Sequence, residues 1–388
     1  MDGQSESERV DRAGAWLFSP ASDALVFGGS AVFGLALVLL RRVLHLGPTL
    51  PEWGFLLGVL AVDVAHVYAT SFRTYFDVDE LRRRPFRYLI VPALAYLGGV
   101  LAHSVSASFF WRLLAYLAVF HFVRQQAGWL ALYRARARDV TARSRLVDSA
   151  AIYSATVYPL VYWHAHLADR AFSWFSPGDF VDVGTVARAI LPAAKAVWAV
   201  SLTAFAVNQA VGFSRNGRAD VGKIVVVTST ASSWYVGIVA TNSDFDFTVT
   251  NVFAHGIPYL WLVFTVAKKA ASTRPTSFVA GVTRAGFATF FGILLLSSFV
   301  EEAAWDRLAW HERPWLFGAS NLTLGAFAAA LVVPLLAVPQ ITHYVLDGFI
   351  WRRRETAGAF VGRGPFTMAA STLGVTDVTD VATARLES

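Results

Sequence analysis

The chain contains no cysteine. This absence excludes disulfide bonds, thiolate metal ligands and a cysteine nucleophile. The sequence also lacks a phosphate-binding glycine loop, a pair of catalytic carboxylates and a nucleophile elbow. The only glycine-rich candidate, GRGP near Gly362, lies in a polar stretch without a preceding strand. Any metal in this protein would therefore be held by histidine and carboxylate side chains.

Charge is also scarce. Only 15% of the 388 residues are charged and 55% are hydrophobic, with a mean hydropathy of +0.49, whereas about a quarter of a soluble domain is charged. A hydrocarbon core about 30 Å thick needs about 20 apolar residues per helix. Stretches of that length recur along the whole chain, and the alternating short strands of a barrel do not. Because lipid cannot satisfy backbone groups, we predict an all-α polytopic membrane bundle of roughly ten transmembrane helices.

The apolar stretches define one transmembrane domain over 23–351. It is preceded by a polar segment, 1–22, without the features of a cleaved signal peptide, and followed by a polar tail, 352–388, expected to be disordered. The predicted spans are 24–40, 54–72, 88–106, 110–133, 148–166, 187–210, 223–241, 248–267, 279–300 and 326–350.

Basic residues gather in alternate connections between these spans. Such connections follow spans two, four, six, eight and ten, and they contain for example Arg84, Arg145, Arg218, Lys269 and Arg353. Cytoplasmic loops carry the lysine and arginine excess. We therefore predict a multi-pass protein of the inner (plasma) membrane with both termini in the cytoplasm. This distribution also accounts for the net charge of +6 without nucleic-acid binding.

Two groups of residues fit this pattern less simply. Arg41 and Arg42 follow span one on the opposite side, so they either snorkel to the interface or indicate an error in the boundary. Arg73 and Asp77 follow span two and are expected to form an interfacial pair.

Four histidines lie inside apolar spans, and each has a polar neighbour three or four residues away. Residues at this spacing share one helix face. Ionisable groups within spans are costly, so they usually face the bundle interior and carry function. The pairs are His66 with Asp63, His121 with Gln125, His255 with Asn251, and His343 with Asp347.

The depths of these histidines follow from a rise of about 1.5 Å per residue. His66 and His121 lie about 16–18 Å below the outer surface, His343 about 22 Å and His255 only about 10 Å. The first three are expected to meet at one level. His255 joins them only if its helix tilts or its span begins several residues earlier than predicted.

Neutral imidazole is a good ligand for iron, copper, zinc and nickel, and a ligating histidine normally donates its second ring N–H to a polar partner. The alternative is that each pair is a structural hydrogen bond between helices. Arg124, beside His121, either binds an anionic group or snorkels to the interface. We predict metal ligation by the four histidines, catalytic roles for Asp63, Asp347 and Arg124, and cofactor-binding roles for Gln125 and Asn251.

Two local resemblances add to this interpretation. The segment VPQITHYVLDGFIWRRR resembles the closing motif of the bacterial β-carotene dioxygenase (bacterio-opsin-related protein) family, with His343 and Asp347 matching. FHFVRQQ resembles that family's His-x-x-Arg-His run, with Gln125 in place of the second histidine. The resemblance implies an integral-membrane enzyme that uses histidine-bound iron to cleave a polyene. NVFAHGIPYLW resembles the His-Gly motif of membrane-bound O-acyltransferases, which implies that His255 is a general base.

Four functions therefore remain open. The first is a non-haem metal-dependent oxidative enzyme that uses a transition metal, iron before others, and acts on a hydrophobic lipid or isoprenoid. The others are an acyltransferase using His255, a transporter or proton relay, and a haem protein with His66 and His121 as axial ligands.

Overall fold

The computed structural model describes residues 16–351, apart from 138, 140, 218 and 273–274. The predicted tail, 352–388, and most of the predicted N-terminal segment lie outside the described residues. The described part consists of helices and loops without any strand, which confirms the all-α prediction.

The first half of the chain forms the following helices, in which η denotes a π- or 3₁₀-helical turn: α2 Pro20–Asp23, η1 Ala24–Gly29, α3 Ser30–Val43, α4 Glu52–Gly54, η2 Phe55–Val64, α5 Ala65–Ala69, η3 Thr70–Arg73, α6 Val78–Arg83, α7 Pro85–Val105, α8 Ala107–Arg136, α9 Ala142–Ala165 and η4 Leu167–Asp169. The second half forms α10 Gly184–Asn216, α11 Val221–Trp234, η5 Tyr235–Ala240, α12 Asp244–Phe247, η6 Thr248–Val252, α13 Phe253–Ala271, α14 Phe278–Ala285, α15 Phe287–Trp305, η7 Asp306–Trp310, α16 Pro314–Phe317, α17 Ala326–Leu336 and α18 Val338–Ile350.

Eight helical segments of the described chain are long and apolar enough to cross a membrane, where the sequence predicted about ten spans. The other two predicted spans are α8 and α9, helices of 30 and 24 residues that are less apolar. Arg112 and Arg124 lie within α8, and Asp148 lies within α9. The protein is therefore a multi-pass helical bundle of the membrane type.

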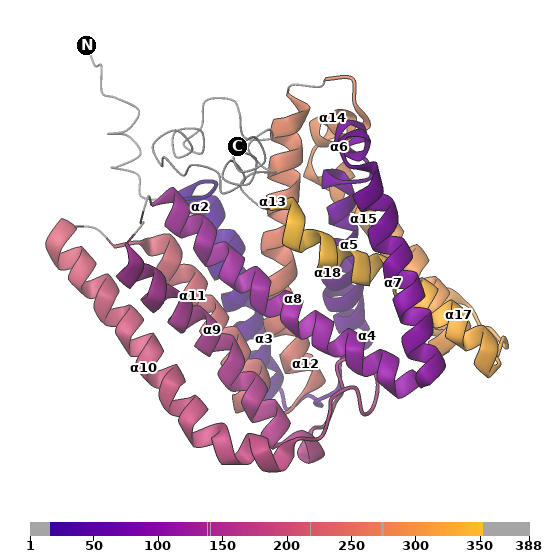
Figure 1. Ribbon diagram of the computed structural model, residues 1–388, viewed down its shortest axis with the longest axis horizontal. Helices are drawn as coiled ribbons and strands as arrows, with labels where there is room; N and C mark the ends of the chain where they lie inside the picture. Colours follow the sequence, from indigo (N-terminus) through magenta and orange to yellow (C-terminus); the bar gives the residue numbers. More distant parts are fainter. Residues whose placement is uncertain (1–15, 138, 140, 218, 273–274, 352–388) are drawn as a thin grey trace, which may run out of the picture.

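Two of the predicted spans are broken helices. The ninth is interrupted at Gly286, whose φ of +109° separates α14 from α15 and favours glycine. The tenth is interrupted at Ala337, and Pro339 follows in the first turn of α18. Proline cannot donate a helical hydrogen bond and clashes with the preceding turn. As a result, α18 does not continue α17 but runs across the bundle toward α13 (Figure 1).

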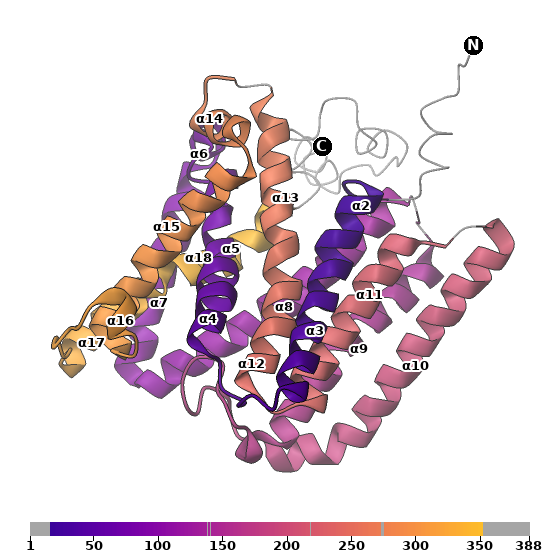
Figure 2. The ribbon, with the colours of Figure 1, turned by 180° about the vertical axis from the view of Figure 1, so that it is seen from behind.

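Helix α13 is the central helix of the bundle. In the most apolar 18-residue stretch of the span Asp244–Ala271, 83% is buried inside the protein, whereas the corresponding share for the span Gly184–Arg215 is 11%. Figure 2 shows α13 standing between α5 and α3, with α10 at the outer edge. The exposed apolar side chains of α10 thus face the surroundings of the bundle, as those of a helix in contact with lipid do.

Two of the basic connections lie at the same end of the bundle. Helices α6 and α14, which adjoin them, lie at the upper end in Figure 1, and α12 lies at the lower end. Arg41 contacts α12 at the lower end. Its Nε and Nη2 atoms each donate a hydrogen bond of 2.6 Å to Asp246 of that helix, a fully buried carboxylate. The arginine that fitted the charge pattern poorly therefore closes an ion pair between α3 and α12.

A second ionic cluster surrounds Lys223 in α11. This lysine is only 1% exposed, and its Nζ atom lies 2.7 Å from Asp139, 3.1 Å from Asp148 and 3.2 Å from Asp220. Three carboxylates thus compensate one buried ammonium group. Because a buried charge is costly unless it is paired, the cluster fixes the connection between α8 and α9 against α11.

Candidate metal centre

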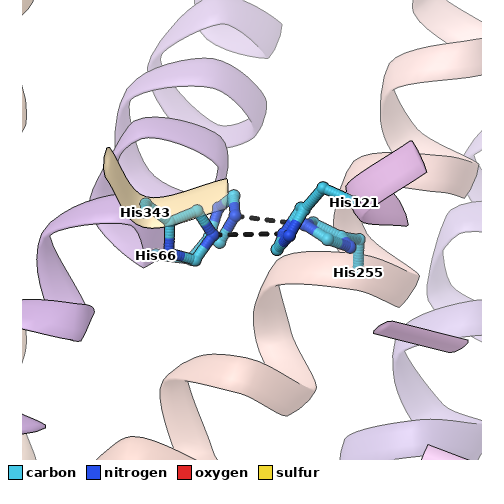
Figure 3. Close-up of side chains that lie close together, drawn as sticks. All are labelled: His66, His121, His255 and His343. Carbon is cyan, nitrogen blue, oxygen red and sulfur yellow. Dashed lines mark hydrogen bonds between the residues drawn. The ribbon is translucent and has the colours of Figure 1, made fainter. Parts of the chain in front are cut away.

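Four helices bring the four predicted histidines to one point inside the bundle. His66 comes from α5, His121 from α8, His255 from α13 and His343 from α18, and none is more than 3% exposed. One ring nitrogen from each lies within 4.8 Å of the others. Figure 3 shows the four rings turned toward one another from separate ribbons. The bundle therefore contains a buried four-histidine cluster that is able to hold a metal ion.

His255 belongs to this cluster, although the sequence placed it too near the surface. The helical segment that carries it begins at Asp244, four residues before the predicted start of the span, and runs without a break through η6 into α13. His255 is thus eleven residues from the start of its helix, which corresponds to about 16 Å at the α-helical rise. By the same count His66 and His121 each lie fourteen residues from the start of their helices, at Glu52 and Ala107, or about 21 Å, so the earlier start brings His255 nearer to their level.

The closest contacts in the cluster are between Nε2 atoms. Nε2 of His255 lies 3.1 Å from Nε2 of His66, and Nε2 of His343 lies 3.1 Å from Nε2 of His121 (Figure 3). The two pairs stand side by side, since the His66 ring also lies 4.9 Å from the His343 ring between centroids. The inner atoms of the cluster are therefore four equivalent imidazole nitrogens.

The outer nitrogen of two rings lies within hydrogen-bond distance of an oxygen atom. Nδ1 of His66 lies 3.3 Å from the carbonyl oxygen of Val62 and 3.8 Å from Oδ1 of Asp63. Nδ1 of His343 lies 2.7 Å from Oγ1 of Thr70, whose hydroxyl is 2.9 Å from that of Tyr259. Because the carbonyl of Val62 can only accept, Nδ1 of His66 is the donor and its Nε2 keeps the lone pair with which imidazole binds metals, and the hydroxyl of Thr70 is compatible with the same tautomer in His343.

The other two rings are held differently. Nδ1 of His121 lies 3.8 Å from Oδ2 of Asp347, which is electrostatic contact rather than a hydrogen bond. Nδ1 of His255 is buried without a hydrogen-bond partner among the described residues. Its ring instead stacks on Phe122, with centroids 3.8 Å apart and planes within 5°. Packing, rather than a polar partner, orients His255.

Two of the predicted polar neighbours, Asp347 and Gln125, contact a different histidine from the one on their own helix. Asp347 is on the helix of His343 but contacts His121. Gln125 is on the helix of His121, and its Nε2 atom donates to the backbone oxygen of His255 over 3.1 Å. Of the four predicted pairs, Asp63 with His66 is the one that the structure brings together within a single helix.

Asn251 and Arg124 lie away from the inner nitrogens. The amide of Asn251 donates to the backbone oxygen of Phe247 and to Thr250, although Asn251 is only 2% exposed. Arg124 has an exposed side chain that donates to the hydroxyl of Tyr153 in α9. The structure does not place either side chain against a histidine of the cluster.

Sequence reasoning missed Thr70 and Gly256. Thr70 lies at helical spacing from His66, but its hydroxyl partners His343 on a distant segment, so no local pattern reveals it. Gly256 allows a close approach of α13 to the helix of His66, because an added Cβ atom would lie 2.6 Å from Cγ1 of Val62 and 3.2 Å from its carbonyl oxygen. In the sequence this glycine forms part of the His-Gly motif that resembles the acyltransferases.

The donor set fits a metal ion. At metal–nitrogen distances of about 2.0–2.1 Å, neighbouring ligand nitrogens are about 2.9 Å apart at a right angle and about 3.4 Å apart in a tetrahedron. Two of the separations, 3.1 Å each, lie between these values, whereas the four nitrogens together spread over up to 4.8 Å. Two lone pairs also repel each other at this distance unless a proton or a cation lies between them. The carboxylates of Asp63 and Asp347 add negative potential beside the rings, which favours the cation.

Comparisons with known protein families, with curated proteins and with solved structures find no match to this chain.

Proposed function

We propose that this protein is a membrane-embedded, histidine-ligated metalloenzyme that acts oxidatively on a lipid or an isoprenoid. The observation that carries the proposal is the convergence of four buried imidazole nitrogens, from four helices, within 4.8 Å. A buried histidine that only holds two helices together needs a single hydrogen bond between those two helices. Four rings that present their nitrogens to one point are the arrangement that a metal requires.

Iron is the metal that we propose, although copper, zinc and nickel share a preference for imidazole. The local resemblance to the β-carotene dioxygenase family supports iron, with His121 and His343 at matching positions. Bound iron with an open coordination position would supply the activation of oxygen. His66, His121, His255 and His343 would hold it, and Asp63, Asp347 and Thr70 would keep the rings in the ligating tautomer.

The surroundings of the cluster suit an apolar substrate. Tyr259 and Tyr344 lie against the histidine rings, with centroids 5.2 Å from His343 and 4.7 Å from His121 respectively. The cluster itself is enclosed by helices of the bundle, so water has little access to it. A lipid or isoprenoid would reach such a site from the membrane without first entering water.

The geometry favours this function over two of the alternatives. The four nitrogens of a porphyrin occupy the equatorial positions of haem iron, but here four side chains already crowd one point, which leaves no room for a macrocycle. An acyltransferase base needs an orienting partner, and Nδ1 of His255 has none among the described residues. A transporter or proton relay remains the second candidate, because buried histidines and acids inside a bundle also form titrating paths.

Elemental analysis of the full-length protein, purified in detergent without chelator, tests the proposal. We expect stoichiometric iron, a visible spectrum without a haem band, and oxygen consumption that depends on an added polyene or unsaturated lipid. His343→Ala should lose both the iron and the oxygen consumption. Protein without any stoichiometric transition metal would refute the metalloenzyme and leave the proton relay. Stoichiometric zinc would keep the metal site but refute the oxidative chemistry.

A further inference from the structure

Arg73 is a buried cation whose positive charge the protein leaves incompletely compensated. It ends η3, the last turn of the helix that carries His66, and it is only 7% exposed. Its Nε atom is buried and has no hydrogen-bond partner among the described residues. An arginine within a span is expensive unless it is paired. The interfacial pair with Asp77 that the sequence suggested does not account for this atom.

The nearest acidic residues are engaged elsewhere. Asp77 and Glu80 influence Arg73 electrostatically. Asp77 caps α6 by accepting a hydrogen bond from the backbone of Glu80, and Glu80 accepts from Arg84 and from Tyr88, each over 2.8 Å. These carboxylates lower the cost of the buried charge, but they do not form the fork of paired hydrogen bonds that a guanidinium makes with an oxyanion.

Two routes connect Arg73 to the histidine cluster. In a 3₁₀ helix the side chains of residues i and i+3 are eclipsed, so Arg73 lies on the same side of η3 as Thr70, the hydroxyl partner of His343. The guanidinium carbon also lies 5.7 Å from the ring centroid of Trp351. That indole donates to Asp347 over 2.6 Å. Thr70 on one route, and Trp351 and Asp347 on the other, thus lie between Arg73 and the histidines.

We propose that Arg73 binds the oxyanion head group, carboxylate or phosphate, of an amphiphilic substrate whose apolar part extends to the histidine cluster. This inference rests on the proposed function and specifies its substrate class. Guanidinium recognises planar carboxylates and phosphates in a bidentate manner.

The position of Arg73 suits the head group of a lipid. It lies at the end of a span, beside α6, which carries Arg82 and Arg83. Helix α14, which follows another basic connection, lies at this end of the bundle too, and a basic surface attracts anionic head groups in the adjoining leaflet. A head group at Arg73 would leave the attached chain among the apolar side chains of the bundle, at the depth of the cluster.

The test compares ligands that share one chain and differ in the head. Full-length protein in a nonionic detergent is titrated with dodecanoate, dodecyl phosphate and the neutral dodecanol, and metal content is measured on the same samples. We expect the two anions to bind about 10- to 100-fold more tightly than the alcohol, as charged hydrogen bonds imply. Arg73→Ala should remove this difference, and Arg73→Lys should retain part of it. Equal binding of anion and alcohol by the wild type would overturn the proposal without any variant.

Arg82→Ala is the matched control, because it removes the same charge from an exposed side chain nearby. It should keep the preference for the anions. Persistence of that preference in Arg73→Ala with normal metal content would also overturn the proposal. Competition by inorganic phosphate would indicate a site for free phosphate groups, whereas binding of amphiphiles alone would indicate a lipid. If the wild-type protein contains no metal but still binds the anions more tightly, the metalloenzyme is refuted and the Arg73 site stands.

Discussion

Asp347 follows His343 by four residues on α18, yet its Oδ2 atom lies 3.8 Å from Nδ1 of His121 on α8. Its other oxygen accepts the indole N–H of Trp351 over 2.6 Å. The carboxylate that the sequence assigned to one histidine thus lies beside another. Helix α18 therefore supplies one ring of the cluster and places a carboxylate beside a second.

The four histidines should act as one unit in metal binding. We expect His66→Ala, His121→Ala, His255→Ala and His343→Ala each to lower metal occupancy sharply, because each removes one inner nitrogen. His164→Ala is the control, since that ring is bonded to Tyr116 and to the backbone outside the cluster. Metal content per chain after membrane extraction measures the effect. Normal occupancy in His255→Ala would mean that this ring is only a neighbour of the site.

Thr70→Val tests the tautomer of His343. Valine has nearly the shape of threonine but lacks the hydroxyl 2.7 Å from Nδ1. Loss of such an outer partner typically weakens metal affinity or activity about 10- to 100-fold. Thr70→Ser, which keeps the hydroxyl, should stay near the wild type. Metal affinity is read by competition with a chelator, and equal affinities in the two variants would show that the hydroxyl does not orient the ring.

Asp347 should tolerate an amide better than a hydrocarbon. Asp347→Asn keeps an acceptor for Trp351 but loses the charge beside His121, so we expect bound metal with reduced activity. Asp347→Leu also leaves the indole N–H unsatisfied, at a cost of about 1–3 kcal/mol. Metal content and thermal unfolding of both variants measure the difference. Negligible effects of both changes would remove Asp347 from the site.

The ionic cluster around Lys223 predicts a pH dependence of stability. Burial alone would raise the pKa of the Asp139 carboxyl, but hydrogen bonds from Lys223 and Ser144 outweigh it and lower the pKa to about 2. An unfolded aspartate has a pKa of about 3.9. The folded state therefore binds this proton less readily, and the stabilisation is complete above about pH 4 and is lost as the pH falls toward 2.

Asp139→Asn should accordingly lower the unfolding temperature at pH 6 and have a smaller effect near pH 3. Unfolding of detergent-solubilised protein at both pH values measures this difference. Glu312→Gln, which changes an exposed carboxylate, should show no comparable trend. A difference between wild type and Asp139→Asn that grows as the pH falls would contradict the sign of this prediction.

The orientation of the bundle is open to a direct test. We expect reporter fusions after Arg84, Arg145 and Lys269 to lie in the cytoplasm, because basic connections are retained there. Fusions within 168–184 and 242–247 should report the outside. An outside signal after Arg145 would invert the alternation on which the prediction depends.

The sequence by itself determined the class of protein and the polar residues worth pursuing. Long apolar runs must form helices because lipid offers no hydrogen bonds to a backbone, and that constraint acts on each run separately. The cost of burying a histidine is equally local, so His66, His121, His255 and His343 could be selected one at a time.

The tertiary structure alone decided how these residues combine. Asp347 reaches His121 and Thr70 reaches His343 because α18 breaks away at Ala337 and crosses the bundle, and helical spacing cannot encode a contact between two different helices. The depth of His255 depends on a helix that begins at Asp244, amid polar residues that hydropathy assigns to a loop. Arg73 likewise matched an ordinary interfacial arginine until packing enclosed it, because burial is a property of the neighbours rather than of the residue.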